Sequence, residues 1–342
     1  MEDSLVPKES VDYIAKSEIQ ESWANYLSKN GAPIATVIEI TNVCPNNCAH
    51  CYANISIGKN TETMSTNTFN NLLEIIANNN DKPEQIWLVG GEPTKHPKLK
   101  EYLQKTRELG FQAMVVTTGE SFADKEYCEK IVPNADKIDI TIRGLNTFHD
   151  LMMLPANDEI FSSIPNGLSD NDQIVYVTEK LAQREPNNKH FDNTIRGLEN
   201  ISDTITKTGC NTIIGLNVDI QATTNLYELI KLLSSHNIKI GNIILQIQTF
   251  SEDNEDLANI LPNRWRKPTT AIIEEYISQA KSLVEDGLYN GNIEIIDPIP
   301  SDILADLKSD NVDLESIYNP TATPAIGPTG KLRSNVINEK SI

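Results

Sequence analysis

The chain has little that would hold it in a membrane, on a nucleic acid or in a secretory pathway. Its apolar runs are no longer than a strand, so no transmembrane helix is expected, and Met1–Leu5 lacks the basic and apolar regions of a secretion signal. Only 29 of the 342 residues are basic against 48 acidic ones, and the net charge of −19 opposes contact with a phosphate backbone. The sequence therefore predicts a cytoplasmic protein with no membrane or nucleic-acid partner.

Cysteine is also scarce, and its distribution is uneven. Of the five cysteines, Cys44, Cys48 and Cys51 are crowded into one segment, Cys128 and Cys210 lie far away, and none follows Cys210. An odd number with three close together does not indicate a disulfide framework. A reducing compartment is predicted, which is also what a labile group bound by thiolates requires.

The three crowded cysteines form a C-x3-C-x2-C segment directly after the apolar run Ile34–Ile40. Three thiolates on one loop can each ligate one iron of a cubane cluster and leave the fourth iron without a protein ligand. Zinc bound by these cysteines and His50 is an alternative, although zinc sites more often use C-x2-C pairs with a second pair downstream. A redox thiol group is a third interpretation. The spacing favours iron–sulfur and leaves the other two open.

Apolar periodicity predicts helices that alternate with six strands. The strands are expected at residues 35–40, 85–89, 111–117, 137–142, 211–220 and 242–248, and the helices at 11–27, 65–76, 97–109, 122–131, 192–208, 225–236 and 269–286. This alternation predicts the α/β class, with a parallel sheet that forms a partial (β/α)6 TIM-like barrel, an N-terminal helix and a small C-terminal extension.

Three regions are expected along the chain. Residues 1–32 form an N-terminal helical segment, residues 33–250 the barrel core, and residues 251–342 a C-terminal helix and extension. The core is interrupted at about 145–191 by a segment rich in Asn, Asp and Pro. A connection of this length carries either a small subdomain or a cover for a functional site, and both alternatives remain open.

Unusual polar motifs fall where the predicted strands end. They are the cysteine segment, Gly90-Gly91-Glu92-Pro93, Thr117-Thr118-Gly119, Thr141-Ile142-Arg143-Gly144, the pair Asn217 and Asp219, and the pair Gln246 and Gln248. Each of these two pairs is spaced two residues apart and so lies on one face of its strand. Since the βα loops of a parallel barrel all open at the carboxyl ends of the strands, a single functional site is predicted there.

The cysteine segment and the Gly-Gly-Glu-Pro segment together resemble the signature of the radical S-adenosylmethionine (radical SAM) superfamily, over roughly residues 35 to 250. The resemblance implies that Cys44, Cys48 and Cys51 hold a [4Fe-4S] cluster whose fourth iron binds S-adenosyl-L-methionine. It also implies that Gly90, Gly91, Glu92 and Pro93 receive the methionine ammonium of this cofactor. Glycines permit close backbone approach, and a carboxylate is a natural partner for an ammonium.

The same resemblance assigns further cofactor contacts. They are His50 and Tyr52 beside the third cysteine, Thr117 and Thr118 in a turn that resembles Thr-Asn-Gly, Thr141 and Arg143 in one that resembles Ser-Leu-Asp-Gly, and Asn217 near the ribose. Arg143 departs from the pattern because an acidic residue is common there. Its charge is expected to act on the cofactor carboxylate or on a substrate anion.

The implied reaction is reductive cleavage of S-adenosylmethionine, with a reductant such as flavodoxin or ferredoxin, to a 5′-deoxyadenosyl radical that takes hydrogen from a substrate C–H bond. Residues 323–333 resemble the C-terminal SPASM/twitch extension of peptide-modifying relatives, but the auxiliary-cluster cysteines are absent. The substrate is therefore expected to be a ribosomal peptide. A small-molecule metabolite and a non-catalytic metal-binding scaffold protein are the alternatives.

Each of four residues outside the motifs has two interpretations. Cys128 and Cys210 could return a hydrogen atom to a product radical, but lone cysteines are usually buried apolar residues. His149 and His190 fall in the insertion and could touch substrate, but a lone histidine is more often a hydrogen-bonded structural residue.

Overall fold

The fold was obtained as a computed structural model. It describes residues 15–30, 33–46, 48, 51, 62–154, 158–184, 190–220, 225–246, 270–295, 325–326 and 332–333. Over these residues, no helix combines the length and the apolar character that a bilayer crossing requires.

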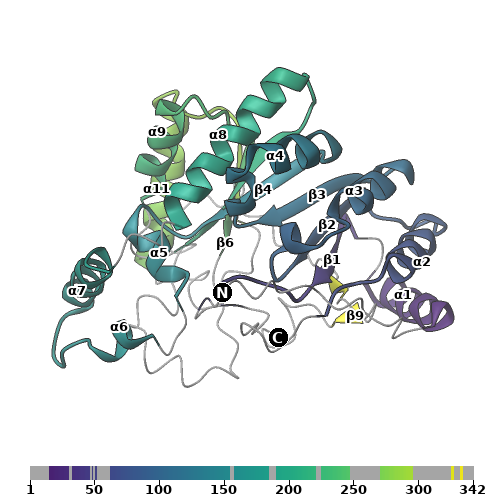
Figure 1. Cartoon of the computed structure of the whole chain (residues 1–342), viewed down its shortest axis with the longest axis horizontal. Helices are drawn as coiled ribbons and strands as arrows, with labels where there is room; N and C mark the ends of the chain where they lie inside the picture. The colour runs from purple at the N-terminus through teal and green to yellow at the C-terminus, as the bar shows by residue number, and fades with distance from the viewer. Residues whose placement is uncertain are drawn as a thin grey trace.

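A single sheet organises the described part of the chain (Figure 1). Its strands are β1 (Ala35–Thr41), β2 (Gln85–Gly90), β3 (Gln112–Thr117), β4 (Lys137–Ile142), β5 (Ile213–Asp219), β6 (Asn242–Gln246), β7 (Asn292–Ile295), β8 (Ala325–Ile326) and β9 (Leu332–Arg333). They lie in the order β7-β6-β5-β4-β3-β2-β1-β8-β9, and every neighbouring pair is parallel except β8 with β9. The six expected strands are confirmed, and β7 and β8 extend the sheet at its two edges.

The main helices follow the expected alternation. They are α1 (Lys16–Asn30), α2 (Thr66–Ala77), α3 (Leu99–Glu108), α4 (Lys125–Ile131), α8 (His190–Thr208), α9 (Leu226–Ser235) and α11 (Thr270–Glu285), with short 3-10 turns η1 (Pro93–Lys95), η2 (Glu120–Ala123) and η3 (Val132–Asn134). Ser65 caps α2 by accepting from the Thr68 backbone N–H, and Asn225 caps α9 by accepting from that of Glu228. Both caps begin the helix where a side-chain oxygen can satisfy a free backbone donor.

The two faces of the sheet differ in chemistry. Alternate strand residues such as Ile38, Leu88, Val115, Ile140 and Leu216 join the helices in one buried apolar cluster. The intervening positions carry polar or amphipathic side chains, among them Glu39, Trp87, Lys137, Asp139, Asn217 and Asn242. A closed (β/α)8 barrel usually fills its interior with branched apolar residues. The polar inner face of this sheet is instead suited to a ligand.

The insertion forms a small helical unit with its own core. It contains α5 (Thr147–Met152), α6 (Glu159–Ser162) and α7 (Asp170–Ala182), and Figure 1 shows α6 and α7 beyond the end of α5, on the side away from α1 and α2. Its buried apolar residues form a second cluster: Phe148, Leu151, Met152, Leu154, Ile160, Phe161, Val177 and Leu181. Helix α5 packs on both α7 and α8, which fixes the unit to the barrel.

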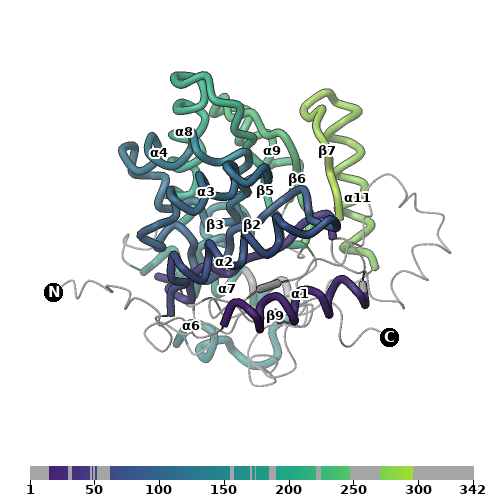
Figure 2. The backbone as a smooth tube through the Cα atoms, turned by 90° about the vertical axis from the view of Figure 1, so that its right-hand side faces the viewer, coloured from purple at the N-terminus to yellow at the C-terminus, as the bar shows by residue number. Residues whose placement is uncertain are grey.

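The C-terminal strands return to the beginning of the sheet. Ala325 and Ile326 of β8 pair with Val37 and Ile38 of β1, and β9 contacts α1, as Figure 2 shows. The edge of the strand that precedes the cysteines is therefore covered by residues from the far end of the sequence.

Candidate functional site

The segment that leads to the cysteines is hydrogen-bonded to the Gly-Gly-Glu-Pro turn. The backbone N–H of Gly91 donates to the Thr41 carbonyl over 2.7 Å, and that of Glu92 donates to the Val43 carbonyl over 2.8 Å. The Thr41 hydroxyl in turn accepts from the Val43 backbone N–H over 3.0 Å. These bonds fix the chain one residue before Cys44.

The two glycines of this turn permit that contact. A Cβ on Gly90 would lie 2.2 Å from the Thr41 carbonyl oxygen, and one on Gly91 would lie 2.5 Å from that of Val43. Gly90 also has a φ of +144°, which other residues rarely adopt. The two glycines therefore allow the backbone of the cysteine segment to lie directly against this turn.

Glu92 is the centre of a buried hydrogen-bond network. Its Oε1 accepts from the hydroxyls of Thr94 and Thr117 over 2.6 and 2.5 Å and from the Thr94 backbone N–H. Its Oε2 accepts from the backbone N–H and the hydroxyl of Thr118 over 3.0 and 2.9 Å. The residue is 2% exposed. Its carboxylate joins the ends of β2 and β3, so in this structure it faces threonines rather than open space.

Two of these cysteines, Cys44 and Cys48, lie where burial favours the protonated thiol unless a metal binds. Burial raises the pKa of Cys44, and it raises the pKa of Cys48 to about 11 although the Arg143 guanidinium acts to lower it. The Cys51 backbone N–H donates to the Cys48 carbonyl over 3.1 Å, which links these two cysteines. A coordinated metal removes such protons outright, so these thiols suit a metal centre.

Among the described residues, no three His, Cys, Asp or Glu side chains converge as a single metal ion would require. A cubane cluster has no such requirement, because each thiolate ligates a different iron. His50 and Tyr52 lie outside the described residues, as does Gln248.

The ends of β4 and β5 bring four polar residues together. Thr141 and Asn217 pair across the two strands, and Asn217 Oδ1 is buried with no hydrogen-bond partner among the described residues. Arg143 Nη1 donates to Asp219 Oδ2 over 2.5 Å, and the Asp219 side chain is fully buried. A buried acceptor without a donor is costly unless a ligand supplies one. The orphan oxygen of Asn217 therefore marks a place for a hydroxyl or an N–H group.

His149, a residue of the insertion, completes this end of the site. Its Nδ1 accepts from the Arg143 backbone N–H over 3.1 Å, and its Nε2 is buried without a partner in the described part of the chain. Burial, reinforced by Arg143, lowers the pKa of His149 to about 3. The ring is therefore neutral, with its proton on Nε2.

Glu120 links the cysteine segment to the end of the insertion. Its Oε1 accepts from Asn46 Nδ2 over 3.2 Å, and its Oε2 lies 2.9 Å from Nδ1 of His190. Burial acts to lower the pKa of His190, but the hydrogen bond and the charge of Glu120 raise it overall. Glu120 was not expected from the sequence, because an acidic residue after a Thr-Thr-Gly turn resembles an ordinary surface residue.

Deeper in the barrel, Asp139 and Lys137 form an ion pair of 3.0 Å beside Gly215. A Cβ on Gly215 would lie 1.7 Å from Asp139 Oδ1, so the glycine makes room for the carboxylate. Burial raises the pKa of Asp139, although Lys137 acts to lower it. Lys137 also stands over the Trp87 ring, 6.0 Å from its centroid. These side chains were not expected from the sequence, because they lie within the strands and outside the motifs at the strand ends.

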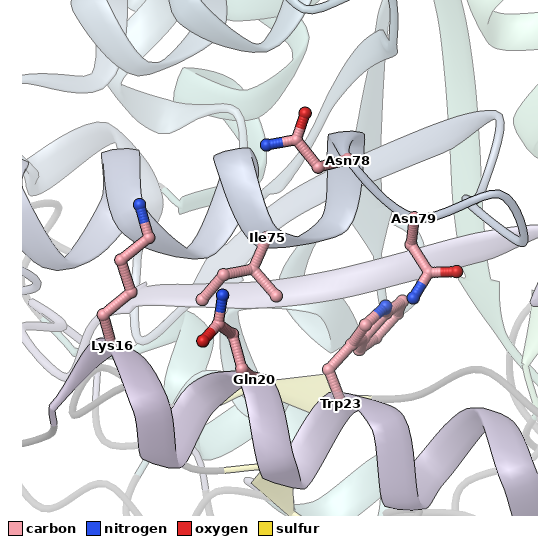
Figure 3. A pocket seen from close by; sticks show the side chains of 6 residues that line it. All are labelled: Lys16, Gln20, Trp23, Ile75, Asn78 and Asn79. Atoms are coloured by element: carbon pink, nitrogen blue, oxygen red, sulfur yellow. The ribbon is translucent and has the colours of Figure 1, made fainter.

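A cavity of about 360 Å³ opens elsewhere, between α1 and the end of α2 (Figure 3). Its described lining consists of Lys16, Gln20, Trp23, Ile75, Asn78 and Asn79. None of these is a predicted site residue, and none belongs to the cysteine segment.

A family comparison decides the class of the protein. The model of the radical SAM superfamily matches residues 38–230, which is more than half of the chain and includes the cysteine segment and the sheet through β5. The chain belongs to the radical SAM superfamily. Members of this superfamily are enzymes that use a [4Fe-4S] cluster and S-adenosylmethionine.

Curated relatives within the superfamily match only a part of the chain. PqqA peptide cyclase of Methylorubrum extorquens (strain PA1) is 25% identical over 115 residues, which is 34% of this chain and 29% of that protein. Fe-coproporphyrin III synthase of Methanosarcina barkeri is 29% identical over 128 residues, 37% of this chain and 31% of that protein. The chain thus spans less than a third of the length of these relatives.

Solved structures share the fold over most of the chain. SuiB of Streptococcus suis, bound to S-adenosylmethionine, superposes with a TM-score of 0.58 at 13% identity, over 92% of this chain and 64% of that one. Methylornithine synthase (PylB) superposes with a TM-score of 0.52 at 11% identity, over 99% and 89%. At these identities the likeness is one of fold, and it agrees with the expected partial barrel.

The residues present fit the two groups that the superfamily uses. Three half-buried cysteines offer thiolates to a cluster, the turn at Gly90 and Gly91 sets their loop beside β2, and the orphan Asn217 oxygen can accept from a nucleoside hydroxyl. Arg143 brings a positive charge to the ends of β4 and β5, and this charge is paired with Asp219.

Proposed function

We propose that the chain is a radical SAM enzyme with a single [4Fe-4S] cluster held by Cys44, Cys48 and Cys51. The main support is that the cysteine segment is hydrogen-bonded to the Gly-Gly-Glu-Pro turn, and that both lie within the region that matches the radical SAM superfamily model. When bound, the cluster and S-adenosylmethionine supply reductive cleavage to a 5′-deoxyadenosyl radical that abstracts hydrogen from a substrate C–H bond. Everything else in the reaction is positioning by the protein.

The residues around the cysteines would bind the cofactor in separate places. The backbone of Gly90, Gly91, Glu92 and Pro93 would face its methionine part, and Asn217 would accept from its ribose. Thr117, Thr118 and Thr141 would lie along it, with His50 and Tyr52 beside the third cysteine. Arg143, held by Asp219, would place a fixed positive charge near Cys48, where anionic sulfur and a carboxylate benefit from it.

The inner face of the sheet would hold the substrate. Its polar side chains, including the pair Lys137 and Asp139, can orient a substrate group inside the barrel, and so can the Trp87 ring. A rigid, water-poor site suits hydrogen abstraction because the target carbon must be held in contact with the reacting centre and side reactions must be suppressed.

For the substrate we propose a ribosomally made peptide. PqqA peptide cyclases are among the relatives, and SuiB, which has the same fold, is known bound to its precursor peptide SuiA. The runner-up is a small metabolite, supported by the similarity to Fe-coproporphyrin III synthase. We also propose a reducing, cytoplasmic location, which suits a labile thiolate-bound cluster, and a reductant such as flavodoxin or ferredoxin, because reductive cleavage needs an electron donor.

The proposal is tested by anaerobic reconstitution with iron and sulfide. We expect bound iron and sulfide near four of each per chain, and release of 5′-deoxyadenosine from S-adenosylmethionine with dithionite. Cys48→Ala is expected to lose both, whereas Cys210→Ala, in a cysteine far along the sequence, is expected to keep both. Zinc in place of iron, or a cluster that never cleaves the cofactor, would overturn the proposal.

A second experiment addresses the substrate. Short peptides encoded beside the gene are incubated with the reconstituted enzyme, and their mass is followed with 5′-deoxyadenosine release. We expect a peptide to change mass and to increase the release. If small metabolites increase the release of 5′-deoxyadenosine and no peptide does, the substrate is a small metabolite.

A further inference from the structure

Among the described residues, the insertion places the side chain of Met153 against a cysteine of the proposed cluster site. The Cys48 thiol donates to the thioether sulfur of Met153 over 3.7 Å. Met153 follows α5 directly and is 3% exposed, yet it belongs to neither of the apolar clusters that the described residues form. The side-chain contact recorded for this buried methionine is with a cysteine of the proposed cluster.

The start of the insertion is fixed in this position. His149 of α5 accepts from the Arg143 backbone N–H over 3.1 Å. A Cβ on Gly144 would lie 2.3 Å from the Phe148 ring, so α5 lies directly on the end of β4. The position of Met153 is therefore set by the fold.

The end of the insertion is tied to the same loop. Glu120 accepts from Asn46, between Cys44 and Cys48, and pairs with His190 at the start of α8. The Phe191 backbone N–H donates to Asp150 of α5 over 2.7 Å, which joins the two ends of the insertion to each other. Both ends are thus bound beside the cysteines.

We propose that the insertion is the cover of the cluster site and that Met153 is the positioning residue that closes it, by packing on Cys48 and keeping water from the cluster. This inference rests on the proposed function. Solvent exposure is one of the factors that set the potential of an iron–sulfur cluster. Because reduction adds negative charge, which water stabilises, a dry cluster has the lower potential and is the stronger reductant.

The first test uses the apoprotein. Cys48 is alkylated with iodoacetamide under anaerobic conditions, and its rate is read by peptide mass spectrometry with Cys210 as the internal reference. Met153→Ala is expected to raise the Cys48 rate about tenfold, because it removes the side chain that packs on this half-buried thiol. Met153→Leu, which keeps the volume, is expected to react like the wild type, and so is Val175→Ala, which trims a 54% exposed side chain of the same insertion.

The second test uses the reconstituted protein. Met153→Ala is expected to shift the midpoint potential upward and to bleach faster in air, while Met153→Leu keeps both wild-type values. If Met153→Ala and the wild type have the same Cys48 alkylation rate, midpoint potential and bleaching rate, the proposed cover is wrong. A Met153→Leu protein that behaves like Met153→Ala would overturn it too, since sulfur rather than volume would then be what matters.

The two proposals fail in distinguishable ways. If the wild type binds no cluster, the proposed function is wrong, and the alkylation rates still report whether Met153 covers Cys48. If the wild type binds a cluster and cleaves the cofactor but Met153→Ala is unchanged, only the cover is wrong. Thermal melting of each variant identifies any that has failed to fold.

Discussion

Arg143 and Asp219 form an ion pair of 2.5 Å at the ends of neighbouring strands, with 16% and 0% of their side chains exposed. Each needs the other, because removing one partner leaves a charge buried without compensation. Asp219→Asn is therefore expected to lower the free energy of unfolding by about 3–5 kcal/mol, measured by urea denaturation of the apoprotein.

The matched control for this pair is the double variant Arg143→Met/Asp219→Leu. Replacement of both charges by apolar groups is often close to neutral, so the double variant is expected to be more stable than Asp219→Asn alone. A double variant that is less stable than the single one would show that the buried charge is not the cause.

Glu92→Gln tests the network that joins β2 to β3. The amide keeps one acceptor oxygen but loses the other, which in the wild type accepts from the Thr118 backbone N–H, a donor that cannot turn around. We expect a loss of about 1–3 kcal/mol in stability, the usual cost of an unsatisfied buried group. Glu101→Gln, on the exposed surface of α3, is the control and should change stability little. Equal midpoints in urea for both variants would refute the role of Glu92.

Gly91→Ala tests how the cysteine segment is held. The new methyl group would lie 2.5 Å from the Val43 carbonyl oxygen, one residue before Cys44, so the segment must shift. We expect a stability loss of about 1–3 kcal/mol and less iron retained after reconstitution and desalting. Gly110→Asn is the control, because Gly110 has open space around it and asparagine tolerates its φ of +84°. Full iron retention in Gly91→Ala would contradict the prediction.

Asp150 gives a pH dependence whose sign follows from its environment. Burial raises its pKa to about 6 from an unfolded value of 3.8, against the hydrogen bond from Phe191 and the charge of His190, while Asp192 and Glu120 add to the increase. The folded state therefore holds this proton more tightly than the unfolded state. The stability that Asp150 contributes by binding the proton is lost as pH rises from about 4 through about 6.

The measurement for Asp150 is the stability difference between Asp150→Asn and the wild type, taken from pH 4 to pH 7. Asparagine keeps an acceptor for the Phe191 N–H but has no charge to desolvate. The stability of the variant relative to the wild type should rise with pH, because only the wild type has a buried carboxyl to ionise. Other titrating groups are the same in both proteins and cancel in the difference. A constant difference across this range would show that Asp150 does not titrate as described.

Much of the fold could be predicted, because it depends on local pattern. Apolar runs identified β1 to β6, and the helix starts at Ser65 and Asn225 followed from side chains that cap the first turn. The pairing of β8 with β1 could not be predicted, since nothing local in Ala325–Ile326 specifies a strand so distant in sequence.

The candidate site was predictable only at its motifs. The cysteines and the glycine turn have a spacing that carries chemistry, but the partners of Glu92 and Arg143 come from other strands and depend on register. Met153 lies within the Leu151–Leu154 run, which gives no signal beyond apolar character. Its contact with Cys48 exists because the insertion folds back, which is a tertiary effect.

The pairing of β8 with β1 also affects synthesis. At about 5–20 residues per second, a ribosome needs roughly 15 to 60 seconds to travel from β1 to β8. Throughout that interval one side of β1 exposes its backbone N–H and carbonyl groups, which are a template for pairing with another nascent chain. That side of β1, the strand beside the cysteines, is therefore protected from aggregation only after β8 has been made.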